Sequence, residues 1–519
     1  MWRKWGIGMK TFAAIDIGSY EIAMKIFEIS EERGIREIDH LRHRIELGSD
    51  SYFTGKISYE RIDELCRILR EFTDIMKSYR VEEYKAYGTS AIRETKNTLI
   101  LLDQIRMRTG IEIEVLGNSA QRFLDYKSVA SKGEDFKNII EKGTAFIDIG
   151  GGSIQISLFD QDSLVTTQNI RPGVLRLREE INRISYKSYQ LDELVEELLS
   201  DSYYDFSQMY VQDREIENII LVDDYVSLIV QKNMVASNAG IVSVQDFLEF
   251  VDGLKYKKSE EIAQELGIPR ENTSLLYLSA LLIKHLIKTL GAKMLWAPGV
   301  SLCDGMAYEF AEKHKLLLES HNFEQDILAA ARDINKRYLG SETRIREREE
   351  IALTLFDHLE KLHGLTKRER LLLQLSAILC DCGRFISLNN VGESSFNIIM
   401  STEMIGLSHL ERSIVAYVAK YVSEPFEYYE TLGTVTTLSE ENYLIISKLT
   451  AILRLAEGLV ISHREKCEQV GVNLQPDSVV ITVETAKDMT LERGLFGRSA
   501  DFFEEVFNMK PSIRQIKNI

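Results

Sequence analysis

Apolar and polar residues alternate along the first part of the chain, as they do in β-strands that bury one face. The alternation runs through residues 11–59, in segments such as "TFAAIDIGS" and "EIAMKIFEIS", and predicts three strands. Helical spacing takes over at 59–80, where apolar residues recur three and four positions apart. A strand at "EYKAYGTSA", a helix from about Asn97, a strand at "IEIEVLG" and a helix over 119–133 complete a β-β-β-α-β-α order, which predicts a mixed sheet covered by helices.

A similar order restarts at Gly143. The segment "TAFIDIGGGSIQISLFDQDSLVTTQNIRP" predicts two or three strands, "VLRLREEINRI" a helix and "IENIILVDDYVS" a strand, before helices that reach about Lys313. Helical spacing then dominates from about Asn322 to Ser462, and the tail predicts a strand at "NLQPDSVVITVET" and a short helix at "SADFFEEVFN". We therefore expect four domains: a first lobe over 9–136, a second lobe over 137–317, a helical domain over 318–466 and a small α/β domain over 467–519.

Both halves of the two-lobed region open with the same strand–turn–strand unit, "FAAIDIGSYEIAMKIF" and "AFIDIGGGSIQIS". Each unit places an aspartate, Asp16 or Asp148, at the end of a strand and directly before a glycine turn. Glycine turns let backbone N–H groups approach an anion closely, so two facing turns would grip a polyanion from both sides. The two aspartates could hold Mg²⁺ or orient a water molecule. Two ordinary β-hairpins are the alternative, but the duplicated aspartate favours the functional interpretation.

The net charge of the chain restricts the classes of molecule that its surface can bind. The chain has 80 acidic and 63 basic residues and a net charge of −17, which argues against binding DNA or anionic membranes over its general surface. A phosphate ligand stays compatible with this charge if arginines, backbone N–H groups or a metal build a small cleft. The longest apolar stretch, 275–290, is interrupted by Lys284, His285 and Lys288, so we expect a core helix and no membrane span.

The cysteine content and the N-terminal segment predict the compartment. Five cysteines in 519 residues provide no disulfide framework and are typical of a reducing cytoplasm. The start, "MWRKWGIGMK", has no apolar export region, and Met9 is as acceptable a start as Met1. We therefore expect a cytoplasmic protein.

Several segments together resemble the exopolyphosphatase/guanosine pentaphosphate phosphatase (Ppx/GppA) family. They are "AAIDIGS", "YGTSAIRETKN", "IEIEVLGNSAQRFLDYKSV", "FIDIGGGSIQIS" and "RPGVLRLREEI", in the family's order, and "LFDHLEKLHGLTKRERLLLQLSAILCDCG" is similar to its HD-like domain. The resemblance covers nearly the whole chain. It implies an α/β two-lobed actin-like (ASKHA, ribonuclease H-like) ATPase-type fold, then an all-α HD-like domain and a small α+β C-terminal domain.

The resemblance also implies a reaction and a set of site residues. The reaction is magnesium-assisted hydrolysis of a terminal phosphate of polyphosphate or a guanosine polyphosphate by an activated water. The catalytic residues implied are Asp148, Arg93 and Gln155, with Asp16 and Asp148 as Mg²⁺ ligands. A guanidinium suits a phosphate because its fork meets two oxygens at once. The implied phosphate-binding set is Asp16, Gly18, Ser19, Ser90, Arg93, Gly150, Gly151, Gly152 and Ser153. Members of the family are often dimers, so a homodimer is a further expectation, although no stretch here marks an interface.

The sequence departs from the family at the expected source of the catalytic base. The family's G-x-E-E-A-R segment reads "GNSAQR" over 117–122, and the glutamate after its second glycine turn is Gln155. Neither serine nor alanine accepts a proton from water near pH 7. If the base has moved, Gln155 could position a water, or Asp125, a helical turn beyond Gln121, could reach the cleft; we expect Asp125 to be a solvated helix residue.

Two further departures affect ligand and metal binding. The family's third glycine-rich loop falls on Asp223, Asp224 and Tyr225, whose charge and bulk oppose a phosphate. The His-Asp pair of an HD metal site is replaced by Cys380 and Asp381, and no further histidines complete a ligand set. We therefore expect neither zinc nor an HD-domain metal, and a structural role for the helical domain.

Two functions stay open from the sequence. The first is a divergent exopolyphosphatase or guanosine pentaphosphate phosphatase with a degenerate active site. The second is a catalytically impaired member that binds polyphosphate, a nucleotide or a protein partner and acts as a regulator. The sequence does not decide whether the chain is an enzyme.

Overall fold

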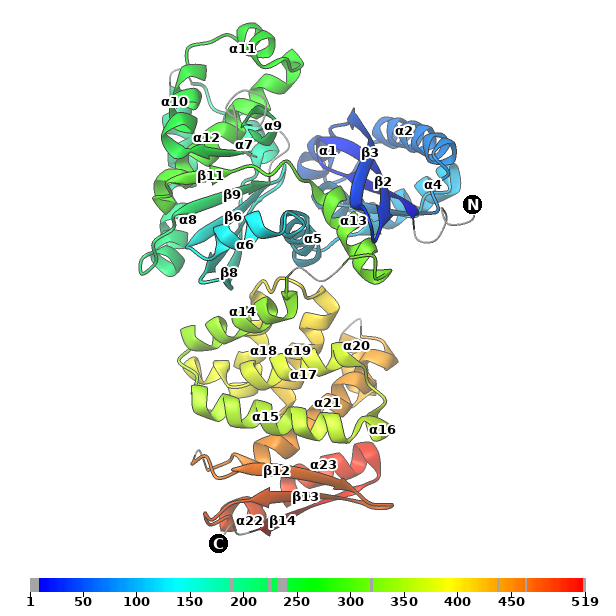
Figure 1. Ribbon diagram of the computed structural model, residues 1–519, viewed down its shortest axis with the longest axis vertical. Coiled ribbons are helices and arrows are strands. Elements are labelled where there is room, and N and C mark those ends of the chain that lie inside the picture. Colours follow the sequence, from blue (N-terminus) through cyan, green and yellow to red (C-terminus); the bar gives the residue numbers. More distant parts are fainter. Residues whose placement is uncertain are drawn as a thin grey trace. The chain divides into compact units, whose positions relative to one another are not determined.

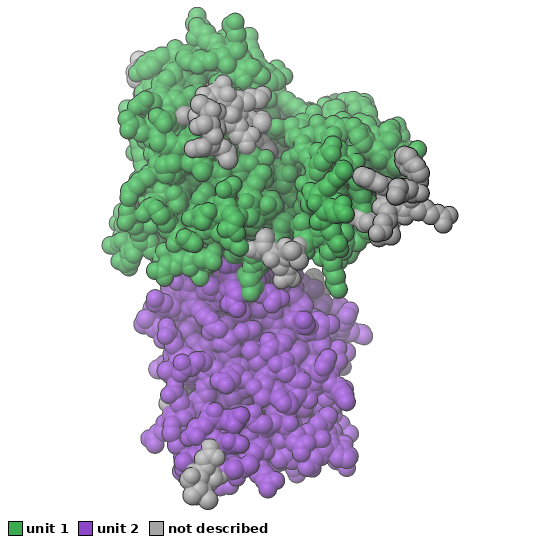
Figure 2. All heavy atoms as spheres, viewed as in Figure 1, with its two compact units in different colours: residues 1–323 green, residues 324–519 purple. Residues whose placement is uncertain are grey.

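The computed structural model describes residues 9–186, 190–222, 226–230, 240–317, 321–435, 438–462 and 464–516. The chain forms two compact units, residues 1–323 and 324–519 (Figure 2). The predicted division into four domains is finer than these two units and stays a prediction. Asp223, Asp224 and Tyr225, the predicted third loop, lie outside the described residues.

The first half of unit 1 is built on a mixed five-stranded sheet with the order β3-β2-β1-β4-β5 (Figure 1). Its strands are β1 (Lys10–Ile17), β2 (Glu21–Ser30), β3 (Gly34–Arg44), β4 (Glu83–Gly88) and β5 (Glu114–Val115). Its helices are α1 (Leu47–Phe53), α2 (Tyr59–Ser78), α3 (Ser90–Glu94), α4 (Thr98–Thr109), α5 (Asn118–Ala130) and α6 (Glu134–Ile140). The three predicted strands are present. The prediction that strand structure continues to residue 59 is wrong, because residues 47–53 form helix α1. The backbone N–H of Gly48 donates to the carbonyl of Ser19 at 2.7 Å, a tertiary contact that the local pattern does not contain.

The second half of unit 1 repeats the same hairpin. Its sheet has the order β10-β11-β9-β6-β7-β8. β1 pairs antiparallel with β2 and parallel with β4, and β6 pairs antiparallel with β7 and parallel with β9. The internal repeat predicted from the two glycine turns is therefore a repeat of strand pairing. The strands are β6 (Thr144–Ile149), β7 (Ile154–Asp160), β8 (Ser163–Ile170), β9 (Asn218–Val222), β10 (Ile241–Ser243) and β11 (Met294–Trp296).

Helices between residues 174 and 313 complete the second half. They are α7 (Val174–Asn182), α8 (Leu191–Phe206) with a π-helical turn (Ser207–Val211), α9 (Val226–Ile229), α10 (Val244–Leu254), α11 (Ser259–Leu266), α12 (Thr273–Leu290) and α13 (Leu302–Lys313). The stretch Arg270–Leu290 would be long and apolar enough to cross a membrane, but 78% of its apolar window is buried inside the protein. It packs as the core helix that its interrupted apolar pattern predicts.

Helix α13 returns to the first sheet although it follows the second half in the sequence (Figure 1). The ring of Phe310 stacks on Phe12 of β1 with centroids 4.4 Å apart, and Lys25 of β2 pairs with Asp304 at 2.8 Å. On its other side α13 packs against α5, where Gly305 lies so close to the carbonyl of Leu124 that a Cβ would overlap it. The position of α5 is therefore fixed by a helix that lies about 180 residues later in the sequence.

Unit 2 contains helices followed by a small sheet. The helices are α14 (Phe323–Arg337), α15 (Glu342–His358), α16 (Glu360–His363), α17 (Lys367–Leu379), α18 (Val391–Ser401), α19 (His409–Tyr421), α20 (Tyr429–Val435) and α21 (Glu440–Leu459). Strands β12 (Gln469–Leu474), β13 (Ser478–Glu484) and β14 (Lys510–Ile516) form one sheet with helices α22 (Thr490–Leu495) and α23 (Gly497–Phe507). The predicted helical region and its strand-containing tail are both present.

A buried charge cluster surrounds Asp381 in unit 2. Arg348 is fully buried, and its Nη1 donates to Asp381 at 2.6 Å and to Glu457 at 3.1 Å. Arg344 pairs with the same two carboxylates, and Arg384 donates to Asp381 at 2.7 Å. Burial alone would raise the pKa of Asp381, but the charges of Arg348 and Arg344 outweigh it and hold this pKa far below its ordinary value. Guanidinium groups thus surround Asp381 and compensate its charge.

Candidate functional site

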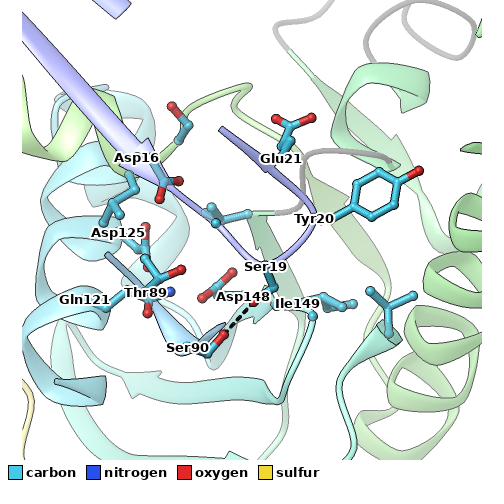
Figure 3. A pocket seen from close by; sticks show the side chains of 17 residues that line it. Asp16, Ser19, Tyr20, Glu21, Thr89, Ser90, Gln121, Asp125, Asp148 and Ile149 are labelled. Carbon is cyan, nitrogen blue, oxygen red and sulfur yellow. Dashed lines mark hydrogen bonds between the residues drawn. The ribbon is translucent and has the colours of Figure 1, made fainter. Parts of the chain in front are cut away.

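The two glycine turns enclose one cavity of about 120 Å³ (Figure 3). The first half contributes Asp16, Gly18, Ser19 and Ser90 to its lining, and the second contributes Asp148, Gly150 and Gly151. Helix α5 adds Gln121 and Asp125. Most of the predicted phosphate-binding residues therefore meet at one place, although they come from segments more than 100 residues apart.

The two turns have the same backbone geometry. The N–H of Gly18 donates to the carbonyl of Glu21, and the N–H of Gly150 donates to that of Ser153, each at 3.0 Å. The second turn also rests on the start of α7, because the N–H groups of Val174 and Leu175 donate to its carbonyls at 3.1 and 3.0 Å. These N–H groups of α7 are engaged by the turn. A phosphate in the cavity therefore has to be met by the N–H groups of the turns themselves.

Three hydroxyl groups form a hydrogen-bonded triangle at the site. The Ser19 and Ser90 hydroxyl oxygens lie 2.9 Å apart, and Tyr52 Oη lies 2.6 Å from the first and 2.7 Å from the second. The Tyr52 ring lies under the guanidinium of Arg176, 4.3 Å from its centroid, and burial raises the pKa of its phenol. Tyr52 was not among the predicted site residues. No motif marks it, since its position depends on the fold of α1.

Removing the Tyr52 hydroxyl tests this triangle. We expect Tyr52→Phe to lower the free energy of unfolding by about 1–2 kcal/mol, because two partly buried hydrogen bonds are lost. The matched control is Tyr204→Phe, whose ring is 65% exposed and which should change stability by less than about 0.5 kcal/mol. Thermal unfolding of both variants measures the difference. Equal midpoints would show that the triangle contributes nothing to stability.

The cavity lining is strongly acidic. Asp16, Glu21, Asp125 and Asp148 line it, and no lysine, arginine or histidine is among its described lining residues. Asp125 is only 3% exposed, so the expectation of a solvated helix residue is wrong. Gln121 and Asp125 are one helical turn apart and face the cavity together, because α13 fixes which side of α5 is turned inward. A polyanion needs compensating positive charge to enter such a cavity.

The donor set fits Mg²⁺. Carboxylate and amide oxygens are the ligands that Mg²⁺ prefers, and it is usually held by one or two carboxylates together with waters and substrate phosphates. Among the described residues no three His, Cys, Asp or Glu side chains lie close enough to share one ion. The predicted pair Asp16 and Asp148 would leave the other coordination positions of the ion to waters and phosphate oxygens.

Some predicted site residues do not line the cavity. Arg93 donates from Nη1 to the carbonyl of Leu116 at 2.5 Å, and Gln155 is buried with its Oε1 accepting from Arg122 Nε at 2.7 Å. Gly152 lies against the Tyr52 hydroxyl instead, and Ser153 contributes its carbonyl to the turn. The roles predicted for these residues stay predictions.

The sequence matches two related family models. The model described as "Ppx/GppA phosphatase family" matches residues 26–314, and "Ppx/GppA phosphatase, domain III" matches residues 337–497. Together they span both compact units.

Known proteins show the same similarity at low identity. The chain is 20% identical over 500 residues to a guanosine-5'-triphosphate,3'-diphosphate pyrophosphatase of Vibrio atlanticus, covering 93% of this chain and 92% of that protein. It is 26% identical over 144 residues to exopolyphosphatase 1 of Mycobacterium tuberculosis, covering 28% of this chain and 40% of that protein. The alignment thus spans less than half the length of that curated relative.

A solved structure supports the fold of unit 1. The structure of an exopolyphosphatase-like protein superposes with a TM-score of 0.50 at 17% identity, covering 59% of this chain and 99% of that one. The predicted two-lobed α/β fold is confirmed to that extent. The HD-like character of the helical domain and the class of the C-terminal domain stay predictions.

Proposed function

Because the chain belongs to the Ppx/GppA phosphatase family, we propose that it hydrolyses the terminal phosphoanhydride bond of inorganic polyphosphate or guanosine pentaphosphate. The observation that supports this most is the single cavity lined by both glycine turns and both repeat aspartates. The names of the relatives cover both substrate classes. The cavity is small, which suits one terminal phosphate and not the whole polymer.

In this proposal each half of unit 1 contributes to binding the terminal phosphate. The N–H groups of the two turns and the hydroxyls of Ser19 and Ser90 donate to its oxygens. Asp16 and Asp148 hold Mg²⁺ on the acidic side of the cavity. When bound, the ion neutralises charge on the phosphate and polarises its P–O bonds. The walls of the cavity keep bulk water from the reacting phosphorus.

A non-catalytic role is the second candidate. The family's two acidic residues at the start of α5 are Ser119 and Ala120 here, and Gln155 is bound to Arg122. General base catalysis contributes about 10²–10⁴-fold, so a chain without a base would bind its ligand and turn it over slowly. Such a member would act as a regulator that senses polyphosphate or a guanosine polyphosphate, or that binds a protein partner.

The test is phosphate release by the purified full chain from long-chain polyphosphate and guanosine pentaphosphate in the presence of Mg²⁺. We expect release, and we expect Asp148→Asn to reduce it by at least about 10–100-fold, the loss produced by altering even the outer partners of a metal ligand. Asp162→Asn is the control, because Asp162 is exposed in the β7–β8 turn with φ near 60°, which asparagine tolerates.

Binding measured on the same samples separates the two candidates. Binding without release would favour the regulator. If the chain neither binds nor hydrolyses these ligands, the enzyme and the ligand-sensing regulator are both overturned, and only a regulator that binds a protein partner is left. Release that survives Asp148→Asn would overturn the site assignment.

A further inference from the structure

We propose that Asp125 is the general base of this reaction, replacing the acids that the start of α5 lacks. The proposal rests on the phosphohydrolase function proposed above. Asp125 is an aspartate that is 3% exposed and still lines the cavity between the two turns. Asp125 thus presents a carboxylate to the cavity that, in the proposed function, holds the terminal phosphate.

The position of Asp125 suits this role. Figure 3 shows its side chain within the cavity, on the same side as Asp16 and near Gln121 and Asp148. The Asp16 and Asp148 carboxylates end the strands that lead into the glycine turns. Asp125 instead projects from α5, between the two halves. A carboxylate there can contact a water molecule that approaches a phosphate held by the turns.

Helix α5 is held rigidly, so the carboxylate is fixed in place. Lys127 Nζ pairs with Glu312 of α13 at 2.7 Å, and Gly305 of α13 approaches the α5 backbone at Leu124. The buried Tyr126 ring packs among aromatic rings, 5.2 Å from Phe159 and 5.5 Å from Phe136 between centroids. The residue on either side of Asp125 is therefore anchored. A base held on a rigid element loses little in orientation before the reaction.

The other side chains at the cavity are less suited than Asp125 to act as the general base. Glu21 pairs with Arg42 at 2.7 Å, and its side chain is committed to that ion pair. Asp16 and Asp148 are the proposed metal ligands and come from β1 and β6, whereas Asp125 comes from α5. No histidine is among the described lining residues, and the amides of Gln121 and Gln155 do not accept a proton near neutral pH. Asp125 is the remaining carboxylate.

The proposed reaction is the attack of a water molecule on the terminal phosphorus. The oxygen of a water molecule forms a bond to the terminal phosphorus, and one of its protons passes to a carboxylate oxygen of Asp125. The bond from phosphorus to the bridging oxygen breaks, and its electron pair stays on the oxygen of the shortened polyphosphate or nucleotide. Inorganic phosphate and the shortened chain leave, and Asp125 releases its proton to solvent. No oxidant or further reactant is needed.

The experiment measures kcat, KM and the pH dependence of kcat for the full chain and for Asp125→Asn, with polyphosphate and Mg²⁺. We expect Asp125→Asn to lower kcat by about 10²–10⁴-fold, to leave KM and polyphosphate affinity unchanged and to remove the acidic limb of the pH profile. Asp125→Glu should keep part of the activity and an acidic limb. The control is Asp135→Asn, the same charge change at an exposed position on α6.

The outcomes separate this proposal from the proposed function. If the full chain releases phosphate and Asp125→Asn keeps its kcat and its acidic limb, Asp125 is not the base although the chain is an enzyme. If the full chain binds polyphosphate and releases none, the proposed function fails and the base assignment fails with it. If thermal unfolding shows that Asp125→Asn is misfolded, Asp125→Glu decides, since a carboxylate base predicts retained activity and a shifted acidic limb. A folded Asp125→Glu that is inactive, or that is active without an acidic limb, would overturn the proposal.

Discussion

The Arg348→Met variant is expected to lose about 3–5 kcal/mol of unfolding free energy, the largest effect on stability that we predict. Arg348 is completely buried and bonds to Asp381, Glu457 and the carbonyl of Ala377. Methionine fills a similar space, but it leaves Asp381 buried with less positive charge around it. Removing one partner of a buried ion pair is costly because the other charge is no longer compensated. Denaturant unfolding of unit 2 in the full chain measures the loss.

Controls distinguish the charge cluster from a general loss of packing. Arg346→Met changes a neighbouring residue whose side chain is 75% exposed and should cost less than about 1 kcal/mol. Adding Asp381→Asn to Arg348→Met should recover part of the stability, since it removes the uncompensated charge. Equal losses in Arg348→Met and Arg346→Met would contradict the role of the cluster.

The same cluster predicts a pH dependence. The pKa of Asp381 is lowered in the folded state, so its contribution to stability is fully present above the unfolded pKa of about 3.9. It is lost progressively as the pH falls below that value and through the folded-state pKa. Acid unfolding of the wild-type chain and of Arg348→Met should therefore converge at low pH. A stability difference between them that does not shrink in acid would contradict this account.

The Gly173→Ala variant is expected to lose about 10²-fold in phosphate release and about 1–3 kcal/mol in stability. A Cβ at Gly173 would lie 2.7 Å from the carbonyl carbon of Gly152 and closer still to Gly150 O and Ser153 N. These are backbone atoms of the second turn, so they cannot move aside by a change of side-chain rotamer. The turn must shift, and a displacement of about 1 Å at a reacting centre is enough for a loss of this size.

Gly253→Ala is the control for this effect. Gly253 lies within α10, and nothing lies within 4 Å of the Cβ that alanine would add. Alanine should stabilise this helix by about 0.5–1 kcal/mol and leave phosphate release unchanged. Similar activity in the two variants would show that the packing of Gly173 on the second turn has no bearing on the site.

Features encoded by neighbouring residues were predictable from the sequence. The two hairpins follow from alternating apolar positions that end in an aspartate and a glycine turn, and the pairing of β1 and β6 repeats as this local pattern predicts. The placement of Asp16 and Asp148 in one cavity follows from the same duplication.

Features set by contacts between distant segments were not predictable. The fold of α1 depends on the bond from Gly48 to Ser19, and with it the position of Tyr52 in the site. Asp125 was expected in solvent because a helical aspartate usually is. Its burial depends on α13, which returns to α5 after the whole second half of unit 1. Arg93 belongs to a segment that resembles a phosphate-binding loop, yet its side chain donates to the carbonyl of Leu116.

The most direct test of the central claim is a crystal structure of the full chain with Mg²⁺ and tetrapolyphosphate. We expect a terminal phosphate between the two glycine turns, within hydrogen-bonding distance of the Ser19 and Ser90 hydroxyls, with Mg²⁺ on Asp16 and Asp148. Phosphate density elsewhere on the protein, with water alone between the turns, would contradict this expectation.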